Sequence, residues 1–324
     1  MKALAISKPI GGFFELETPR GASYYHSDAL ALSNGRACLN VILKTLKPSH
    51  IYVPFYSCDT LIAPAIANGI KYTFYPISQD FEPINLPDLG ADELFVYINY
   101  FGLKGKYARQ LGEYYRDRVV IDNTQAYFEK GYAFSWSFNS CRKFFGVPDG
   151  AFLYPAREID AEYSRNRNFI IDHLFLRLDG RQKEAFAAYQ QNEMLQDCVP
   201  YRISMFSEKI LKGADHGFAA SRRRANFQVY HFELSGLNQL GALALPDEAT
   251  PFCYPLLLNK KITPSYFHEK SIFIPMLWKE VAERRQDGFH LEKGISENML
   301  ALPLDQRYSE EDLHFVINAI KELQ

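Results

Sequence analysis

The chain has 324 residues, which is too many for one ordinary domain, since domains cluster at about 100–150 residues. Its 36 Lys and Arg nearly balance 38 Asp and Glu, and the net charge of -2 excludes a broad electrostatic grip on nucleic acid or on an anionic membrane. Hydrophobic residues make up 47% and charged residues 23%, which is typical of a soluble globular protein. Aromatic residues reach 15%, and packing, interfaces or a pocket for a flat ligand would explain that excess equally well.

The cysteines and the amino-terminal residues indicate the cellular compartment to expect. Without a CxxC pair, we expect neither a disulfide framework nor a metal site from the five widely spaced cysteines Cys38, Cys58, Cys141, Cys198 and Cys253. The chain reaches an acidic residue before any apolar run long enough for a signal peptide, and no segment approaches about 20 uninterrupted apolar residues. We therefore expect a cytoplasmic protein that binds neither a membrane nor nucleic acid.

Strand-like and helix-like segments alternate through the first half of the chain. The patterns predict helices over residues 37–46, 60–68 and 107–117. They predict strands, several of them apolar throughout, over residues 50–54, 71–75, 94–98, 119–121, 133–138 and 151–154. Strands separated by helices indicate βαβ units, so the predicted fold class is α/β with a mostly parallel central sheet.

The second half has a different character. Residues 157–235 predict long helices, and short strands over 252–258 and 271–274 follow among further helices. A last helix is predicted to begin at Ser309, whose hydroxyl can cap it together with Asp312. We place a domain boundary in the helical connection at 215–235. The predicted division is a large α/β domain over 1–225 and a small α+β domain over 226–324.

The first candidate site is the sequence VVIDNTQA at residues 119–126. An acidic residue at the carboxyl end of a buried parallel strand lies where open α/β sheets bind ligands, and a buried carboxylate requires a cation or strong hydrogen bonds. Asp122 would suit a protonated heterocyclic nitrogen, and Gln125 a substituent of the same ring. The alternative is that Asp122 forms an Asx turn and that Gln125 lies on the surface.

The second candidate site surrounds a lysine between aromatic residues. Lys143 precedes Phe144 and a Gly/Pro turn, an environment in which desolvation lowers the pKa of an amine and favours Schiff-base chemistry. The hydroxyls of Ser137 and Ser140 are near enough in sequence to bind a phosphate. The alternative is that Arg142 and Lys143 form a basic pair on a surface loop.

The third candidate is the small-residue turn SNGRA at residues 33–37, which opens an amphipathic helix. Backbone N–H groups of Gly35, Arg36 and Ala37 would bind a phosphate at the helix N-terminus, although capping alone also explains the turn. The chain has no GxGxxG and no GxxxxGK[ST] motif, which argues against dinucleotide and P-loop sites.

The three sites together resemble the DegT-type (DegT/DnrJ-like) sugar aminotransferases, which are fold-type-I pyridoxal-phosphate enzymes. Residues 34–39 are similar to that family's phosphate turn, and residues 53–60 to its loop over the cofactor. Residues 122–126 match its Asp-x-x-Gln-Ala motif, and Lys143 followed by residues 149–151 matches its Lys before Glu-Gly-Gly. Residues 201–204 resemble its Tyr-Arg-Met-Ser segment. The resemblance covers roughly residues 28–324.

The resemblance implies a function. It implies pyridoxal 5'-phosphate as cofactor, bound to Lys143 as an internal aldimine, with Asp122 at the ring nitrogen and Gln125 at the phenolic oxygen. It implies transamination of a nucleotide-linked keto-sugar with an amino donor, in surface polysaccharide biosynthesis. It also implies a homodimer in which Tyr201 and Arg202 reach a site across the subunits.

Several positions depart from the family pattern. The phosphate-binding serine is replaced by Phe138, so Ser137 or Ser140 must substitute, and the Asn that reaches the partner's phosphate is replaced by Pro200. The stacking position aligns with Cys58, so Tyr56 is the candidate for the aromatic face. These departures keep two alternatives open: a relative that has lost catalysis and acts as a binding or scaffold protein, and a pyridoxal-phosphate enzyme of another reaction type.

Overall fold

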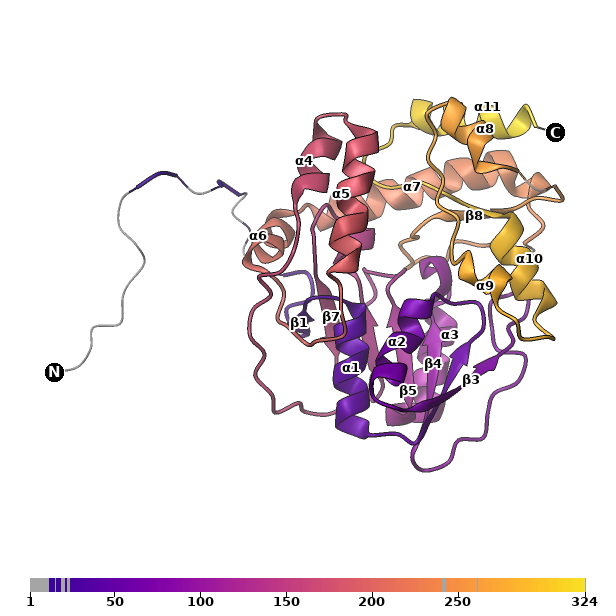
Figure 1. Cartoon of the computed structure of the whole chain (residues 1–324). Coiled ribbons are helices and arrows are strands. Elements are labelled where there is room, and N and C mark those ends of the chain that lie inside the picture. Colours follow the sequence, from indigo (N-terminus) through magenta and orange to yellow (C-terminus); the bar gives the residue numbers. More distant parts are fainter. Residues whose placement is uncertain are drawn as a thin grey trace.

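The computed structural model describes residues 12–14, 16–18, 21, 24–240, 243–260 and 262–323. A seven-stranded sheet in the order β1-β7-β6-β5-β4-β2-β3 forms its centre (Figure 1). The strands β2 to β6 are parallel, whereas β7 runs antiparallel to both β6 and β1. Their bounds are β1 Leu30–Leu32, β2 His50–Pro54, β3 Lys71–Tyr75, β4 Glu93–Ile98, β5 Val119–Asn123, β6 Trp136–Asn139 and β7 Ala151–Tyr154. The predicted α/β fold with a mostly parallel sheet is confirmed.

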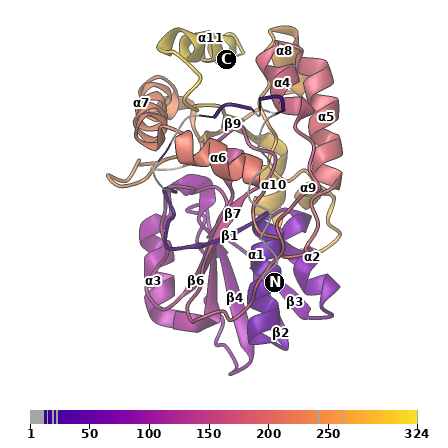
Figure 2. The same cartoon turned by 90° about the vertical axis from the view of Figure 1, so that its left-hand side faces the viewer.

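Helices cover both faces of the sheet. Figure 2 shows α3 (Gly105–Tyr115) on one face and α1 (Gly35–Leu46) and α2 (Asp59–Ala67) on the other. Since β4 and β5 are covered on both sides, their side chains are almost all buried. Short 3-10 turns follow the strand ends and precede β5, namely η1 Tyr100–Gly102, η2 Arg116–Arg118 and η3 Cys141–Lys143.

One predicted strand begins later than its sequence pattern indicates. The run of apolar and aromatic residues from position 133 predicts a strand over 133–138, but β6 begins at Trp136. Phe134 has a φ of 65°, and the left-handed backbone conformation there is incompatible with an extended strand. The side chain of Phe134 instead packs against Arg116, whose guanidinium carbon lies 4.4 Å from the centre of the ring.

The region after β7 is helical, as predicted, although residues 155–170 form an extended connection. The helices are α4 Asp172–Leu178, α5 Gln182–Met194, α6 Met205–Gly213 and α7 His216–Leu234. Figure 1 shows α7 running across the molecule toward the carboxyl-terminal elements. The predicted boundary at 225/226 falls inside this continuous helix and stays a prediction.

The carboxyl-terminal part has a core of its own. A two-stranded antiparallel sheet, β8 (Tyr254–Leu257) and β9 (Met299–Leu302), packs with α7 and with α11 (Glu310–Lys321). The helices α8 Pro264–Glu269, α9 Glu280–Glu283, α10 His290–Asn298 and η4 Ser235–Leu237 complete this part. The predicted cap of the last helix is confirmed, because Ser309 and Asp312 form a reciprocal capping box.

The predicted strand over 271–274 is wrong. Ser271 has a φ of 58° and lies just beyond α8, and the N–H of Ile272 donates to the carbonyl of Phe267 at 2.8 Å. The segment is therefore the end of a helix, closed by a left-handed residue. Its apolar residues Ile272 and Ile274 are buried, which explains why the pattern resembles that of a strand.

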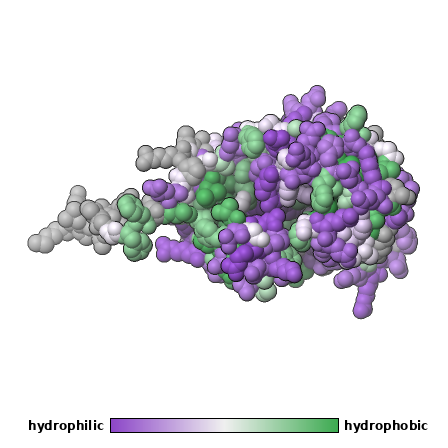
Figure 3. Space-filling view, turned by 90° about the horizontal axis from the view of Figure 1, so that it is seen from above, coloured by the Kyte–Doolittle hydropathy of each residue, from purple (hydrophilic) through white to green (hydrophobic). Residues whose placement is uncertain are grey.

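The surface carries some exposed apolar side chains. Seen from above, hydrophilic side chains cover much of the molecule and hydrophobic ones lie in patches between them (Figure 3). Helices α4 and α5 expose Phe175, Leu178, Phe186, Tyr189 and Met194. Among the described residues, no helix is both long and apolar enough to cross a membrane.

Candidate active site

The site begins at the carboxyl end of β5. Asp122 is 5% exposed and lies between Ile98 of β4 and Phe138 of β6 in the register of the sheet. Its Oδ1 accepts a hydrogen bond from the N–H of Thr124 at 2.8 Å, so the Asx turn of the alternative interpretation does exist. It is nevertheless a buried turn, and Asp122 takes part in none of the ion pairs of the described residues.

Lys143 approaches Asp122 from the turn after β6. Its Nζ donates to Oγ1 of Thr124 at 3.2 Å and lies 5.8 Å from the centre of the Phe252 ring. Burial raises the pKa of Asp122, and the charge of Lys143 opposes that shift. Lys143 is partly buried, and Arg142 beside it forms an ion pair with Glu193, so the two cations are not a basic pair on an exposed loop.

Gln125, the residue after Thr124, is buried, and only one of its two side-chain amide atoms has a hydrogen-bond partner. The side chain is fully buried, which rules out the surface position of the alternative interpretation. Its Oε1 accepts from the N–H of Phe101 at 2.8 Å, while its Nε2 has no hydrogen-bond partner. A buried donor without a partner costs about 1–3 kcal/mol, so a ligand acceptor at this point would be stabilising.

Of Tyr56 and Cys58, only Cys58 is shown to lie toward Lys143. The ring of Tyr56 is fully buried among aromatic side chains, 5.9 Å from Tyr100 and 4.6 Å from Trp278 between ring centres. Burial raises the pKa of the Cys58 thiol, and the charge of Lys143 lowers it, so the thiol lies near that amine. The role of Tyr56 as an aromatic face for the cofactor stays a prediction.

The start of α1 completes this group of residues. A Cβ on Gly35 would lie 3.3 Å from Cγ2 of Thr124 and 3.2 Å from the Phe138 ring, so the helix begins directly against both side chains. Asn34 caps the helix by accepting from the N–H of Ala37 at 2.9 Å. Thr124 thus joins the start of α1 to Lys143.

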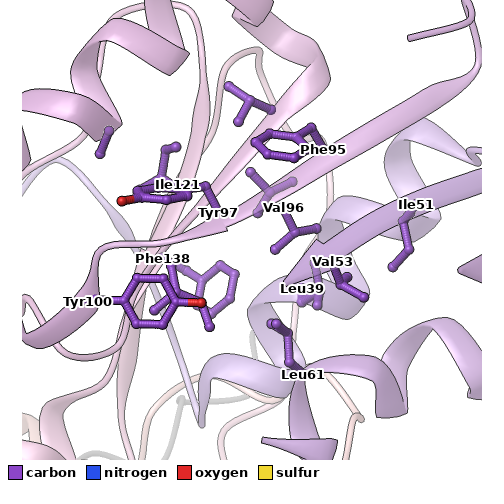
Figure 4. Close-up of a cluster of buried hydrophobic side chains, with 14 of the residues drawn as sticks. Leu39, Ile51, Val53, Leu61, Phe95, Val96, Tyr97, Tyr100, Ile121 and Phe138 are labelled. Atoms are coloured by element: carbon purple, nitrogen blue, oxygen red, sulfur yellow. The ribbon is translucent and has the colours of Figure 1, made fainter. Parts of the chain in front are cut away.

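Phe138 belongs to the hydrophobic core. Its ring is 2% exposed and lies in a cluster with Leu39 and Val96 (Figure 4). The phenyl ring occupies the strand position at which the resembling family has a phosphate-binding serine. An apolar ring therefore stands where the sequence resemblance leads us to expect a hydroxyl.

The two candidate serines lie in different places. Side chains alternate along a strand, so Ser137, which pairs with Ile121, points to the opposite face of the sheet from Phe138 and Asp122. Ser140 is partly buried at the start of η3, and its side chain makes no capping hydrogen bond. This arrangement favours Ser140 over Ser137 as a phosphate ligand, although both assignments stay predictions.

Residues 201–203 lie beside the start of α1. The N–H of Ser33 donates to the carbonyl of Tyr201 at 2.8 Å, and the N–H of Ile203 donates to that of Ala31 at 3.3 Å. The side chain of Arg202 is exposed, whereas that of Tyr201 is partly buried. Their assignment to a substrate stays a prediction.

A buried carboxylate, the first residue of the 149–151 match, fixes this segment. Asp149 is fully buried and accepts hydrogen bonds from the N–H and Oγ of Ser204 at 2.8 and 2.6 Å. It also accepts from Nδ2 of Asn166 at 2.9 Å and from Oγ of Ser207. The turn after Lys143 is thereby joined to the start of α6, a contact across 55 residues that no local pattern indicates.

Two arginines of the second half, Arg223 buried and Arg284 partly buried, contact segments that border the site. Arg223 donates to the carbonyl of Phe252 at 3.1 Å and lies 4.4 Å from the centre of the Phe144 ring. Arg284 donates to the carbonyls of Ser57 and Phe55, and so fixes the loop that carries Cys58. Neither arginine lies in a motif, because each acts on backbone carbonyls far away in the sequence.

Comparison with known proteins identifies the fold. No family model and no curated protein matches the sequence. The sugar aminotransferase CalS13 from Micromonospora echinospora is similar in structure at a TM-score of 0.63 and 14% identity, over 92% of this chain and 88% of that one. DesV from S. venezuelae, in complex with a ketimine intermediate, gives 0.63 and 15% over 91% and 84%. The putative sugar aminotransferase Spr1654 from Streptococcus pneumoniae, in its PMP form, gives 0.64 and 14% over 91% and 87%.

The fold is that of an aminotransferase with a mostly parallel α/β sheet. Within that class, it is the fold of the DegT-type sugar aminotransferases, as the sequence resemblance predicts. The match extends over nearly the whole chain, so it includes both the central sheet and the carboxyl-terminal part.

Proposed function

We propose that this chain is a pyridoxal-phosphate-dependent aminotransferase that acts on a nucleotide-linked keto-sugar. The observation that carries the proposal is the meeting of two groups at Thr124, the Lys143 amine and the buried Asp122 carboxylate, with the unpartnered Nε2 of Gln125 on the next residue of the chain. The meeting point lies at the carboxyl ends of parallel strands, where open α/β sheets bind their ligands. The similar structures bear sugar aminotransferase names, which supports the sugar as substrate.

The donor set fits the ring of pyridoxal phosphate. A buried carboxylate without a cationic partner is costly, and a protonated pyridine nitrogen would supply that partner to Asp122. The free Nε2 of Gln125 would donate to the ring oxygen. Lys143 would bind the cofactor through Nζ, which Thr124 holds near Asp122.

Each residue of the site would have its own role in catalysis. The bound cofactor would supply an electron sink for the substrate carbanion. Lys143 would move a proton at the substrate carbon as general base and acid. Asp122 would keep the ring nitrogen protonated, and Phe252 would exclude water from the side of Lys143 that it covers.

The proposal also covers the pathway, the compartment, the oligomeric state and the domains of the enzyme. We propose surface polysaccharide biosynthesis in the cytoplasm as its context and a homodimer as its form, with Tyr201 and Arg202 near the substrate. The division into a cofactor domain over 1–225 and a smaller domain over 226–324 belongs to the same proposal. It agrees with the separate core that begins at Phe227.

Absorption spectroscopy of the purified protein tests the cofactor. Wild type mixed with pyridoxal phosphate should develop visible absorption, and borohydride should fix the cofactor on the peptide that contains Lys143, as read by mass spectrometry. Lys143→Ala should lose both signals, whereas Lys44→Ala, which removes an exposed lysine of α1, should keep them. A wild type without the lysine adduct would contradict the proposal.

The amino donor gives the second arm of this experiment. Glutamate should convert the bound cofactor to its amine form and discharge the visible band. A protein that forms the adduct but is inert to every amino donor would favour another pyridoxal-phosphate reaction. A protein that forms no adduct yet keeps the fold would favour the binding or scaffold alternative, which the phenyl ring of Phe138 supports.

A further inference from the structure

Three basic side chains gather at the amino-terminal end of α1. Arg36 is the second residue of the helix, and Arg142 and Lys143 lie in η3. Lys143 reaches the helix start through Thr124, whose side chain contacts Gly35. Residues 193–197 at the end of α5 contact both parts: Arg142 forms an ion pair with Glu193, and Nδ2 of Asn34, the cap of α1, donates to Oε1 of Gln196 at 3.3 Å and to the carbonyl of Asp197 at 3.2 Å. Burial lowers the pKa of Arg142, and the charge of Arg36 acts in the same direction.

The charge of Arg36 is not compensated by a direct partner. Arg142 forms an ion pair with Glu193, and Lys143 has a hydrogen bond. Among the described residues, Arg36 makes no hydrogen bond and no ion pair, although its side chain is partly buried and burial lowers its pKa. The charge of Asp197 raises the pKa of Arg36 in part, although the two side chains form no ion pair. A desolvated guanidinium of this kind is stabilised by an anion that accepts its hydrogen bonds.

Neutral donors at the same helix end are also free. The N–H groups of Gly35 and Arg36 take part in no hydrogen bond of the described residues, since the Asn34 cap serves Ala37. The Oγ of Ser33, directly before the cap, is buried and has no partner, and Ser33 is 3% exposed. Free amides at a helix N-terminus, with the helix dipole behind them, favour an anion.

We infer that Arg36 and Arg142, together with the free amides of Gly35 and Arg36, bind a phosphate dianion at the start of α1. These guanidinium groups would serve in place of the serine hydroxyl that the family pattern has at position 138. The inference rests on the proposed function in one respect, namely that the phosphate belongs to the cofactor. A nucleoside diphosphate of the substrate presents the same chemistry, and the experiment below separates the two sources.

Because the proposed ligands are guanidinium groups, phosphate binding at this site should depend on salt concentration. Two charged hydrogen bonds to a phosphate are stronger than those of neutral hydroxyls and weaken as salt screens them. The phosphate should therefore contribute strongly to cofactor affinity at low salt. Pyridoxal, which has the same ring but no phosphate, should bind at least tenfold more weakly than pyridoxal phosphate.

Calorimetry on wild type and on Arg36→Gln, Arg142→Gln and the double variant tests the inference. The titrants are inorganic phosphate, pyridoxal phosphate, pyridoxal and uridine diphosphate. Each single substitution should weaken inorganic phosphate and pyridoxal phosphate at least tenfold and leave pyridoxal unchanged. Arg157→Gln is the matched control, because Arg157 is exposed and bonds to Thr45 at the opposite end of α1. Circular dichroism verifies folding, and Arg36→Lys, which keeps the charge but not the planar fork, should retain part of the affinity.

Each outcome has a distinct meaning. Wild type that binds no phosphate, or variants that bind it as tightly as wild type does, would overturn the inference, even if the Lys143 adduct forms and the proposed function holds. Arginine-dependent phosphate binding without a Lys143 adduct would support the anion site and contradict the proposed function. Arginine-dependent binding of uridine diphosphate, with pyridoxal phosphate indifferent to both substitutions, would refute the cofactor as the source.

Discussion

The two ends of the candidate site differ in how much of the expected residue set they keep. At the end proposed to hold the ring, Asp122 and Lys143 both bond to Thr124, and the buried Gln125 follows it in the chain. At the phosphate end, the strand position expected to hold a hydroxyl holds Phe138, and the free donors are guanidinium and amide groups. The ring end supplies one specific group for each atom it must recognise. The phosphate end requires only positive charge and donors, so several residue combinations can serve it.

The largest expected effect comes from restoring the hydroxyl at the phosphate end. Phe138→Ser should lower the free energy of unfolding by about 3–5 kcal/mol, since it removes a phenyl ring from the core and leaves a cavity. Urea denaturation measures the loss, and Phe138→Leu, which preserves apolar volume, should cost less than half as much. In an Arg36→Gln background, Phe138→Ser should also recover part of the phosphate affinity. An unchanged unfolding free energy would show that the ring is not packed as described.

A smaller effect should separate the ring end from the phosphate end. Asp122→Asn keeps the shape but removes the charge, and we expect pyridoxal phosphate and pyridoxal to lose affinity by the same factor of roughly 100, or about 2.7 kcal/mol. The ratio of the two dissociation constants should therefore stay at the wild-type value, whereas Arg36→Gln should change it. Asp117→Asn, in the exposed turn η2 just before the same strand, is the control. A changed ratio in Asp122→Asn would mean that the two ends do not act separately.

The smallest expected effect is the change in stability with pH that arises from a buried histidine near Phe138. His26 is fully buried, 2.6 Å from the Tyr154 hydroxyl and 3.2 Å from Nδ2 of Asn139, the residue after Phe138. Burial lowers the pKa of His26 to about 3 from 6.5. Because the unfolded chain binds the proton more readily, stability is lost as the pH falls from 6.5 toward 3, by about 2 kcal/mol at pH 5.

The pH dependence of unfolding tests the histidine. Urea denaturation of wild type at pH 7 and pH 5 should show this loss, and His26→Gln, which does not titrate, should reduce it. His314→Gln, an exposed histidine of α11, should leave the dependence unchanged. A pH dependence that is the same in His26→Gln and wild type would contradict the assignment.

Much of the fold follows from local patterns. The bounds of β2, β3 and β7 agree with the predicted strands, because each is a short run set off by turn residues or flanking helices. The strands β1 and β9 are not predicted, since three or four apolar residues beside a helix carry too little periodicity. The juxtaposition of Asp122 and Lys143 follows from their positions after adjacent strands.

Other features of the site depend on contacts between distant segments. Three of these features cannot be read from nearby residues. They are the lack of a direct partner for Arg36, the aromatic surroundings of Tyr56, and the hydrogen bond from Arg284 to the loop around Cys58. Each depends on how the second half of the chain packs on the first. Sequence patterns report which face of an element is apolar, and not which carbonyl a distant guanidinium will meet.

The bonds around Asp149 determine which parts of this protein can move separately. Its carboxylate joins the turn that follows Lys143 to residues 204–207, and the same segment pairs with the strand before α1. The lysine and the start of α1 are therefore connected through one set of hydrogen bonds. Arg223 bonds within the carboxyl-terminal part and Arg284 bonds from that part to the loop around Cys58, so we expect any opening toward a bulky substrate to depend on these two arginines.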